Sequence, residues 1–105
     1  MSHDEVLAMM EEIGVPYSYS HFAEGESPAP PFICFQYPDN EEFAADNVVF
    51  HSNKNLDIEL YTDRKAPALE DRVEEILTAH ELFFHKSEVW IPEERMYEVL
   101  YETTV

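Results

Sequence analysis

The sequence predicts an α+β domain: an antiparallel-rich mixed β-sheet with two α-helices packed on one face, in the order α-β-β-β-β-α-β-β. Three observations support this fold class. Strand-like runs outnumber helical ones, most of them connect through short turns, and the connection from residue 60 to residue 84 holds a helix that could form one crossover. With 105 residues, the chain has the length of a single domain, 1–105, with its own core.

The predicted first helix begins at a capping box, because Ser2 stands three residues before Glu5. Gly14, followed by Pro16, is typical of a helix end. The apolar residues in between recur at helical spacing and are Val6, Met9 or Met10, and Ile13. We therefore expect one apolar stripe facing the sheet.

Three strands and a loop are predicted in the middle of the chain. Residues 17–20 form a weakly patterned strand, and residues 24–31 have the proline and glycine content of an exposed loop. Residues 32–37 are apolar on both faces, which favours a central or covered strand. Residues 48–52 form another strand, joined to the next by a hairpin-like turn.

The clearest pattern lies in residues 55–105. Leu56, Ile58 and Leu60 alternate with polar residues, as in a strand with one buried face. Pro67 suits the first position of a helix. The apolar stripe of that helix consists of Leu69, Val73, Ile76, Leu77 and His80. Two further strands, 83–91 and 96–104, follow around a turn at Pro92-Glu93-Glu94.

The hydrophobic core is expected to combine both helix stripes with alternate strand residues. Its predicted members are Val6, Met10, Ile13, Phe32, Cys34, Leu56, Ile58, Leu60, Leu69, Val73, Ile76, Leu77 and Val99. Cys34 is the only cysteine and lies in an apolar run, so we interpret it as a small buried thiol.

The sequence lacks a recognisable catalytic or metal-binding motif. His80 and His85 are five residues apart, whereas the zinc-protease motif needs four, and they straddle a predicted helix end. The chain has one cysteine and two glycines, too few for a cysteine zinc site or a glycine-rich phosphate loop. We therefore predict a non-enzymatic protein with no catalytic residues, no cofactor and no metal.

The chain is strongly acidic, with 23 Asp and Glu against 6 Lys and Arg, a formal charge of −17. Such a surface repels phosphate backbones, so we expect no specific nucleic-acid binding. The charge has three interpretations: a highly soluble protein, a lumen past which DNA slides, or a surface that imitates DNA. No apolar run is long enough for a bilayer, and the acidic N-terminus lacks the basic start of a signal peptide, so we expect a cytoplasmic protein without a membrane partner.

Three surfaces are candidates for partner binding. One is a face of the last strand, where Tyr97, Val99, Tyr101 and Thr103 alternate with Glu98, Leu100 and Glu102. The aromatic side is interpreted as core. The others are the proline-rich loop 24–31 and an acidic loop 39–46, since loops held on a rigid sheet often bind. The sequence does not choose among the three.

Several segments resemble small tail-component proteins of siphophages and of prophages of Gram-positive bacteria. In chain order they are HFAEGE (21–26) before the proline-rich entry to Phe32, LDIELYTDRK (56–65), PALE (67–70), KSEVWI (86–91) and MYEVLYE (96–102). The resemblance implies a tail-terminator, head–tail joining or tail-completion protein. It further implies an α/β sandwich, partners among tail or neck proteins, a homo-oligomeric ring such as a hexamer, and a place in the virion after assembly in the host cytoplasm.

A second hypothesis belongs to a different class: a small acidic inhibitor, immunity-type protein or DNA mimic that binds a basic partner. Size, charge and the lack of catalytic motifs fit this class as well. Oligomeric state distinguishes the two, because such an inhibitor is expected to be monomeric or dimeric.

Overall fold

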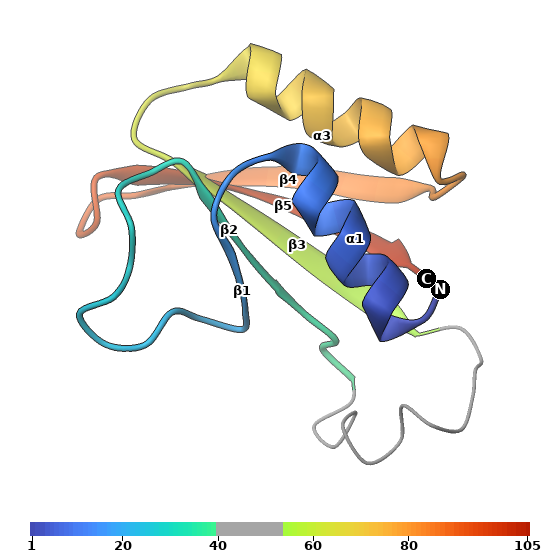
Figure 1. The fold of residues 1–105 in the computed structure, drawn as a ribbon. Coiled ribbons are helices and arrows are strands. Elements are labelled where there is room, and N and C mark those ends of the chain that lie inside the picture. The colour runs from blue at the N-terminus through green and yellow to red at the C-terminus, as the bar shows by residue number, and fades with distance from the viewer. Residues whose placement is uncertain (40–53) are drawn as a thin grey trace.

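The computed structural model describes residues 1–39 and 54–105, and Figure 1 shows their fold. The elements are α1 (His3–Ile13), β1 (Tyr17–Tyr19), β2 (Phe32–Gln36), β3 (Asn55–Thr62), α3 (Pro67–Ala79), β4 (Phe84–Ile91) and β5 (Met96–Thr104). The strands form one sheet in the order β1-β2-β3-β5-β4. β1 pairs with β2 in parallel, and the other three pairings are antiparallel. The predicted α+β class is confirmed; the strand predicted at 48–52 lies outside the described residues.

Both helices lie on the same face of the sheet, as predicted (Figure 1). α1 is joined to α3 by Arg72, whose Nε and Nη2 donate hydrogen bonds to the carbonyls of Ile13 (2.9 Å) and Glu12 (2.7 Å). These carbonyls belong to the last turn of α1, where backbone acceptors lack partners within the helix. A side chain of one helix thus caps the end of the other and fixes their relative positions.

The ends of α1 match the sequence prediction. The Glu5 backbone N–H donates to Ser2 Oγ at 3.1 Å, and the Ser2 N–H donates to Glu5 Oε1 at 2.7 Å. This is a capping box. Gly14 closes the helix at a φ of 88°, a left-handed conformation that glycine adopts without steric cost.

The connection between β3 and β4 is the predicted crossover. β5 lies between these two strands and pairs antiparallel with both, so β3 and β4 run parallel to each other. Parallel strands need a long connection, and α3 supplies it while covering the sheet. Pro67 stands at the start of α3 as expected.

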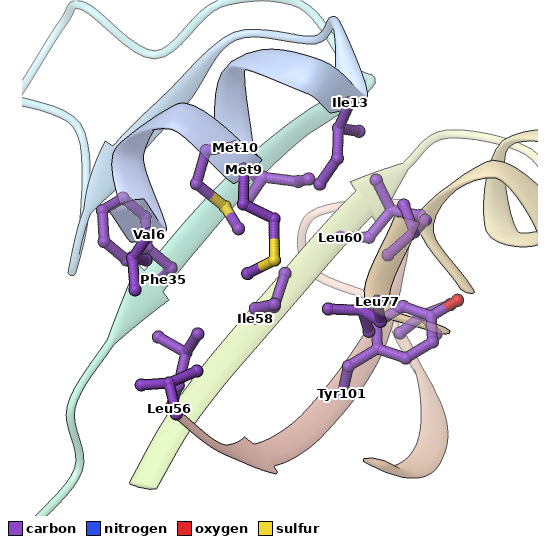
Figure 2. Packing of buried hydrophobic residues seen from close by; sticks show 14 of the residues in the cluster. Val6, Met9, Met10, Ile13, Phe35, Leu56, Ile58, Leu60, Leu77 and Tyr101 are labelled. Atoms are coloured by element: carbon purple, nitrogen blue, oxygen red, sulfur yellow. The ribbon is translucent and has the colours of Figure 1, made fainter. Parts of the chain in front are cut away.

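The core lies between the two helices and the sheet (Figure 2). Met9 and Met10 are both buried in it, together with Phe35, which was not predicted as a core member. Tyr101 is buried as well, as expected for the aromatic side of the last strand. Leu69 and Ile76 are only partly buried at its edge, which corrects the prediction for these two residues. They flank the buried line of α3 that Val73 and Leu77 occupy, because a helix presents only a narrow stripe to a flat sheet.

The strand register defines two chemically different faces of the sheet. Leu56, Ile58 and Leu60 pair with Thr103, Tyr101 and Val99 and point towards the helices; we call this the helix-covered face. The intervening residues Asp57, Glu59 and Tyr61 pair with Glu102, Leu100 and Glu98 on the opposite side. No helix of the described ranges covers that side, which we call the open face.

Candidate functional site

At β2, the open face carries the aromatic ring of Phe32 and the thiol of Cys34. Phe32 and Cys34 are each only 6% exposed, although they point away from the helices and lie outside the main core cluster. The ring of Phe22 packs edge-on against Phe32 at 5.4 Å, and Tyr61 stacks on Phe32 at 5.1 Å. The predicted burial of Phe32 and Cys34 is confirmed, and these two ring contacts explain how Phe32 is buried without a covering helix.

Carboxylates occupy the centre of the open face. Asp57 and Glu59 on β3 face Glu98 and Glu102 on β5. Partial burial raises the pKa of Asp57, of Glu59 and of Glu98, and for Asp57 the nearby charges of Glu102 and Asp39 raise it further. For Glu59 a hydrogen bond from the Tyr61 hydroxyl (3.0 Å) opposes part of this effect. The face thus holds carboxylates in an environment that disfavours their charge.

The basic residues lie elsewhere. Four of the six bind groups on the helix side of the sheet or at the N-terminus; they are Lys54, Lys65, Arg72 and Lys86. Arg64 and Arg95 lie in the connections after β3 and before β5. Consequently no lysine or arginine stands at an open-face position of the sheet. The carboxylates of the open face thus have no lysine or arginine among them, although His85 of β4 lies opposite Glu102.

On the helix side, the carboxylate of Glu70 has the opposite environment. It is 3% exposed and accepts hydrogen bonds from Lys65 (2.6 Å) and Lys86 (2.9 Å). Burial alone would raise the pKa of Glu70, but the hydrogen bonds and charges of the two lysines outweigh it and hold the pKa below its usual value. Lys65 also pairs with Glu88, and Lys86 with Glu74 at 2.7 Å.

This ion-pair network ties α3 to the outer strands. The buried Tyr101 hydroxyl donates to Glu74 Oε2 at 2.9 Å, which adds β5 to the network. Lys86 comes from β4 and binds both Glu70 and Glu74, so the network joins α3, β4 and β5 through these two carboxylates. The sequence showed no sign of this network, because Glu70 stands among several acidic residues of the same helix.

The exposed apolar side chains gather at β4. Val89 and Trp90 are 52% and 44% exposed, and Phe83, the residue before the strand, is 95% exposed. Trp90 contacts Tyr97 of β5 at 4.8 Å, so one side of its ring is covered. β4 is the last strand of the sheet and pairs only with β5. The run Val89-Trp90-Ile91 could have indicated this exposed apolar surface from the sequence, but it was not among the three predicted surfaces.

The structure separates the two histidines that the sequence placed five residues apart. His80 closes α3, and its Nε2 lies 3.1 Å from Glu12 Oε2 of α1. His85 is exposed on β4. Groups of three or more potential metal ligands are not found in the described residues. Burial, with Glu59 and Glu98 nearby, raises the pKa of the Cys34 thiol to about 11, so the thiol is protonated and unreactive at neutral pH.

The three surfaces suggested by the sequence have different outcomes. The aromatic side of the last strand belongs to the core, since Val99, Tyr101 and Thr103 are buried, and its acidic side belongs to the open face. The proline-rich loop 24–31 is mostly exposed and remains a candidate. The acidic loop 39–46 lies outside the described residues, apart from Asp39, which accepts a hydrogen bond from Asn55.

Comparisons with protein-family models, with curated proteins and with solved structures find no match for this chain. α1 and α3, the helices of the described ranges, both lack the length and apolarity needed to cross a membrane. The fold and the site define an α+β domain with an acidic sheet face that carries no lysine or arginine, and with an edge strand, β4, that exposes Val89 and Trp90.

Proposed function

We propose that the protein is a non-enzymatic structural component of a phage virion, a tail-terminator or head–tail joining subunit that assembles into a ring with tail or neck proteins. The observation that carries this proposal is the resemblance of segments along nearly the whole chain. Four of these segments, between residues 56 and 102, lie in the unit β3-α3-β4-β5. The resembling segments therefore fall mostly on the elements that build the sheet and its crossover.

The distribution of charge supports the same proposal. A closed ring needs a contact between two different surfaces of neighbouring subunits, and edge strands and exposed loops provide such surfaces. Carboxylates without basic neighbours, such as those around Glu98, would repel the DNA that passes through a tail. An acidic inner wall would thus let DNA slide without binding it.

The open face also favours a second candidate function, an acidic inhibitor or DNA mimic. Asp57, Glu59, Glu98 and Glu102 form two facing rows with no lysine or arginine between them. A basic nuclease site would supply the missing positive charge. This candidate predicts a monomer or dimer with nanomolar affinity for a basic protein, whereas the tail component predicts a larger ring.

A genetic experiment tests the first proposal. A stop codon early in the gene, in a phage or prophage that carries it, should leave heads and tails unjoined or tails of irregular length in electron micrographs. A synonymous change at the same codon is the matched control, and supplying the protein in trans should restore virions. Normal, infectious virions from the stop-codon phage would contradict the proposal.

The two candidates also differ in their response to salt. With a formal charge of −17, subunits repel each other at low ionic strength, and the Debye length falls from roughly 30 Å at 0.01 M to about 3 Å at 1 M salt. For the tail component, light scattering at high protein concentration should show a species larger than a dimer as salt is raised or when tail tubes are added. A monomer at every salt concentration, together with nanomolar binding of a basic nuclease, would favour the inhibitor.

A further inference from the structure

The edge strand β4 has an unused pairing side. It runs over eight residues, from Phe84 to Ile91, and is the end strand of the described sheet, with β5 as its one neighbour (Figure 1). Its residues are all exposed or half-buried. One row of backbone N–H and C=O groups therefore faces away from β5, and such a row is a template for another strand.

The features that usually block an edge are weak in β4. The strand contains no proline, and its charged side chains are held by the helix side: Lys86 binds Glu70 and Glu74, and Glu88 binds Lys65. In the described part of the chain, the exposed large apolar residues are Phe83, Val89 and Trp90, all in or beside this strand. The combination of an open backbone and apolar side chains indicates an interface.

We propose that β4 pairs antiparallel with β4 of a second copy of this chain, around a two-fold axis at Ser87. In an antiparallel pair, directly opposite residues point to the same face of the sheet. If the two copies are related by a two-fold axis and their sheet faces are continuous, the axis must therefore pass beside a residue that lies opposite its own copy. A centre at Lys86 or at Glu88 would place like charges opposite each other. A centre at Ser87 places Lys86 opposite Glu88 of the second copy and Phe84 opposite its Trp90.

This pairing goes beyond the proposed function and does not depend on it. A two-fold contact uses the same surface of both copies, whereas a ring needs a contact between two different surfaces. β4 pairing thus joins free subunits into dimers and leaves the other surfaces for a ring or a partner. The dimer is favoured at high salt, where the repulsion between two chains of charge −17 is screened.

Site-directed crosslinking tests the register. In Ser87→Cys the two thiols meet at the axis, within the separation of about 4.4–6.8 Å between Cα atoms that a disulfide needs. The matched control Val89→Cys lies on the same strand and the same face. In this register, position 89 of one copy lies opposite position 85 of the other, so the two Val89→Cys thiols are separated by four residues along the strands, or about 14 Å. The native Cys34 is buried and does not compete.

Both full-length variants are incubated at high salt with oxidised glutathione, which takes up the two electrons and two protons of each new disulfide, and are then resolved on non-reducing gels. We expect at least tenfold more dimer from Ser87→Cys than from Val89→Cys. A mixture of His85→Cys and Val89→Cys should give the mixed dimer, since these positions face each other in this register. No dimer from Ser87→Cys, or equal amounts from both single variants, overturns the proposal.

Discussion

The two sides of the sheet hold their carboxylates in opposite ways. On the helix side, Glu70 is almost fully buried yet ionised, because Lys65 and Lys86 both bind it. On the open face, Glu59 and Glu98 are more exposed but have no basic neighbour, and partial burial raises the pKa of each. With six basic residues, the chain places four where they stabilise the fold and leaves the open face with uncompensated charge. The helix side thus uses its basic residues for stability, and the open face is left free for the partners that we propose.

The largest expected difference between the two sides concerns apolar burial. Leu60 is fully buried beneath the helices, so Leu60→Ala should lower the free energy of unfolding by about 2–5 kcal/mol. Leu100 is half-buried on the open face, and Leu100→Ala should cost only about 1 kcal/mol. Urea unfolding followed by circular dichroism measures both. Equal losses would show that the open face is covered as well as the helix side.

The next effect concerns the ion-pair network. Glu70→Gln should destabilise the protein by about 1–3 kcal/mol at neutral pH, because it removes a charge that two lysines bind. The pKa of Glu70 is lowered in the folded state, so its stabilisation is present above the usual value of 4.5 and is lost as pH falls through the folded pKa. The difference between Glu70→Gln and wild type should therefore shrink in acid. A difference that is constant with pH would contradict this role.

A smaller effect arises within the helix-covered face, where two buried threonines differ in one hydrogen bond. The Thr62 hydroxyl has no hydrogen-bond partner among the described residues, whereas the Thr103 hydroxyl donates to the Phe83 carbonyl at 2.6 Å. Thr62→Val should stabilise the protein by about 1 kcal/mol, because it removes an unsatisfied buried polar group. Thr103→Val should destabilise it by a similar amount, about 1 kcal/mol. Thermal unfolding of the pair tests the contrast; a loss in both variants would reveal a partner for Thr62.

The smallest effect belongs to the open face. Burial raises the pKa of Glu98 in the folded state, so ionised Glu98 opposes folding as pH rises from 4.5 through the folded pKa. Glu98→Gln should therefore be neutral or gain a few tenths of a kcal/mol at neutral pH, since water screens a half-buried charge. The gain should disappear in acid, opposite to Glu70→Gln. Marked destabilisation by Glu98→Gln at neutral pH would indicate a basic partner for it within the chain.

The elements that depend on local rules could be predicted from the sequence. The capping box of Ser2 and Glu5, the glycine stop at Gly14, Pro67 at the start of α3 and the alternation of Leu56, Ile58 and Leu60 all lie where they were predicted. Each depends on neighbours within a few residues, because hydrophobic periodicity and preferred backbone geometry are properties of short segments. The two-sided apolar run around Phe32 likewise indicated the buried strand β2 correctly.

Which side chains meet could not be predicted, because it depends on how distant segments pack together. In the sequence, Glu70 is one of several acidic residues of a helix. In the structure, Lys65 from a loop and Lys86 from a strand both bind its carboxylate. Nor does the pattern of β4 reveal that it ends the sheet, because strand order follows from the crossover through α3 rather than from any local signal. Contacts between residues far apart in the chain depend on topology, and it is topology that concentrates the cations on one side and leaves the other side acidic and open.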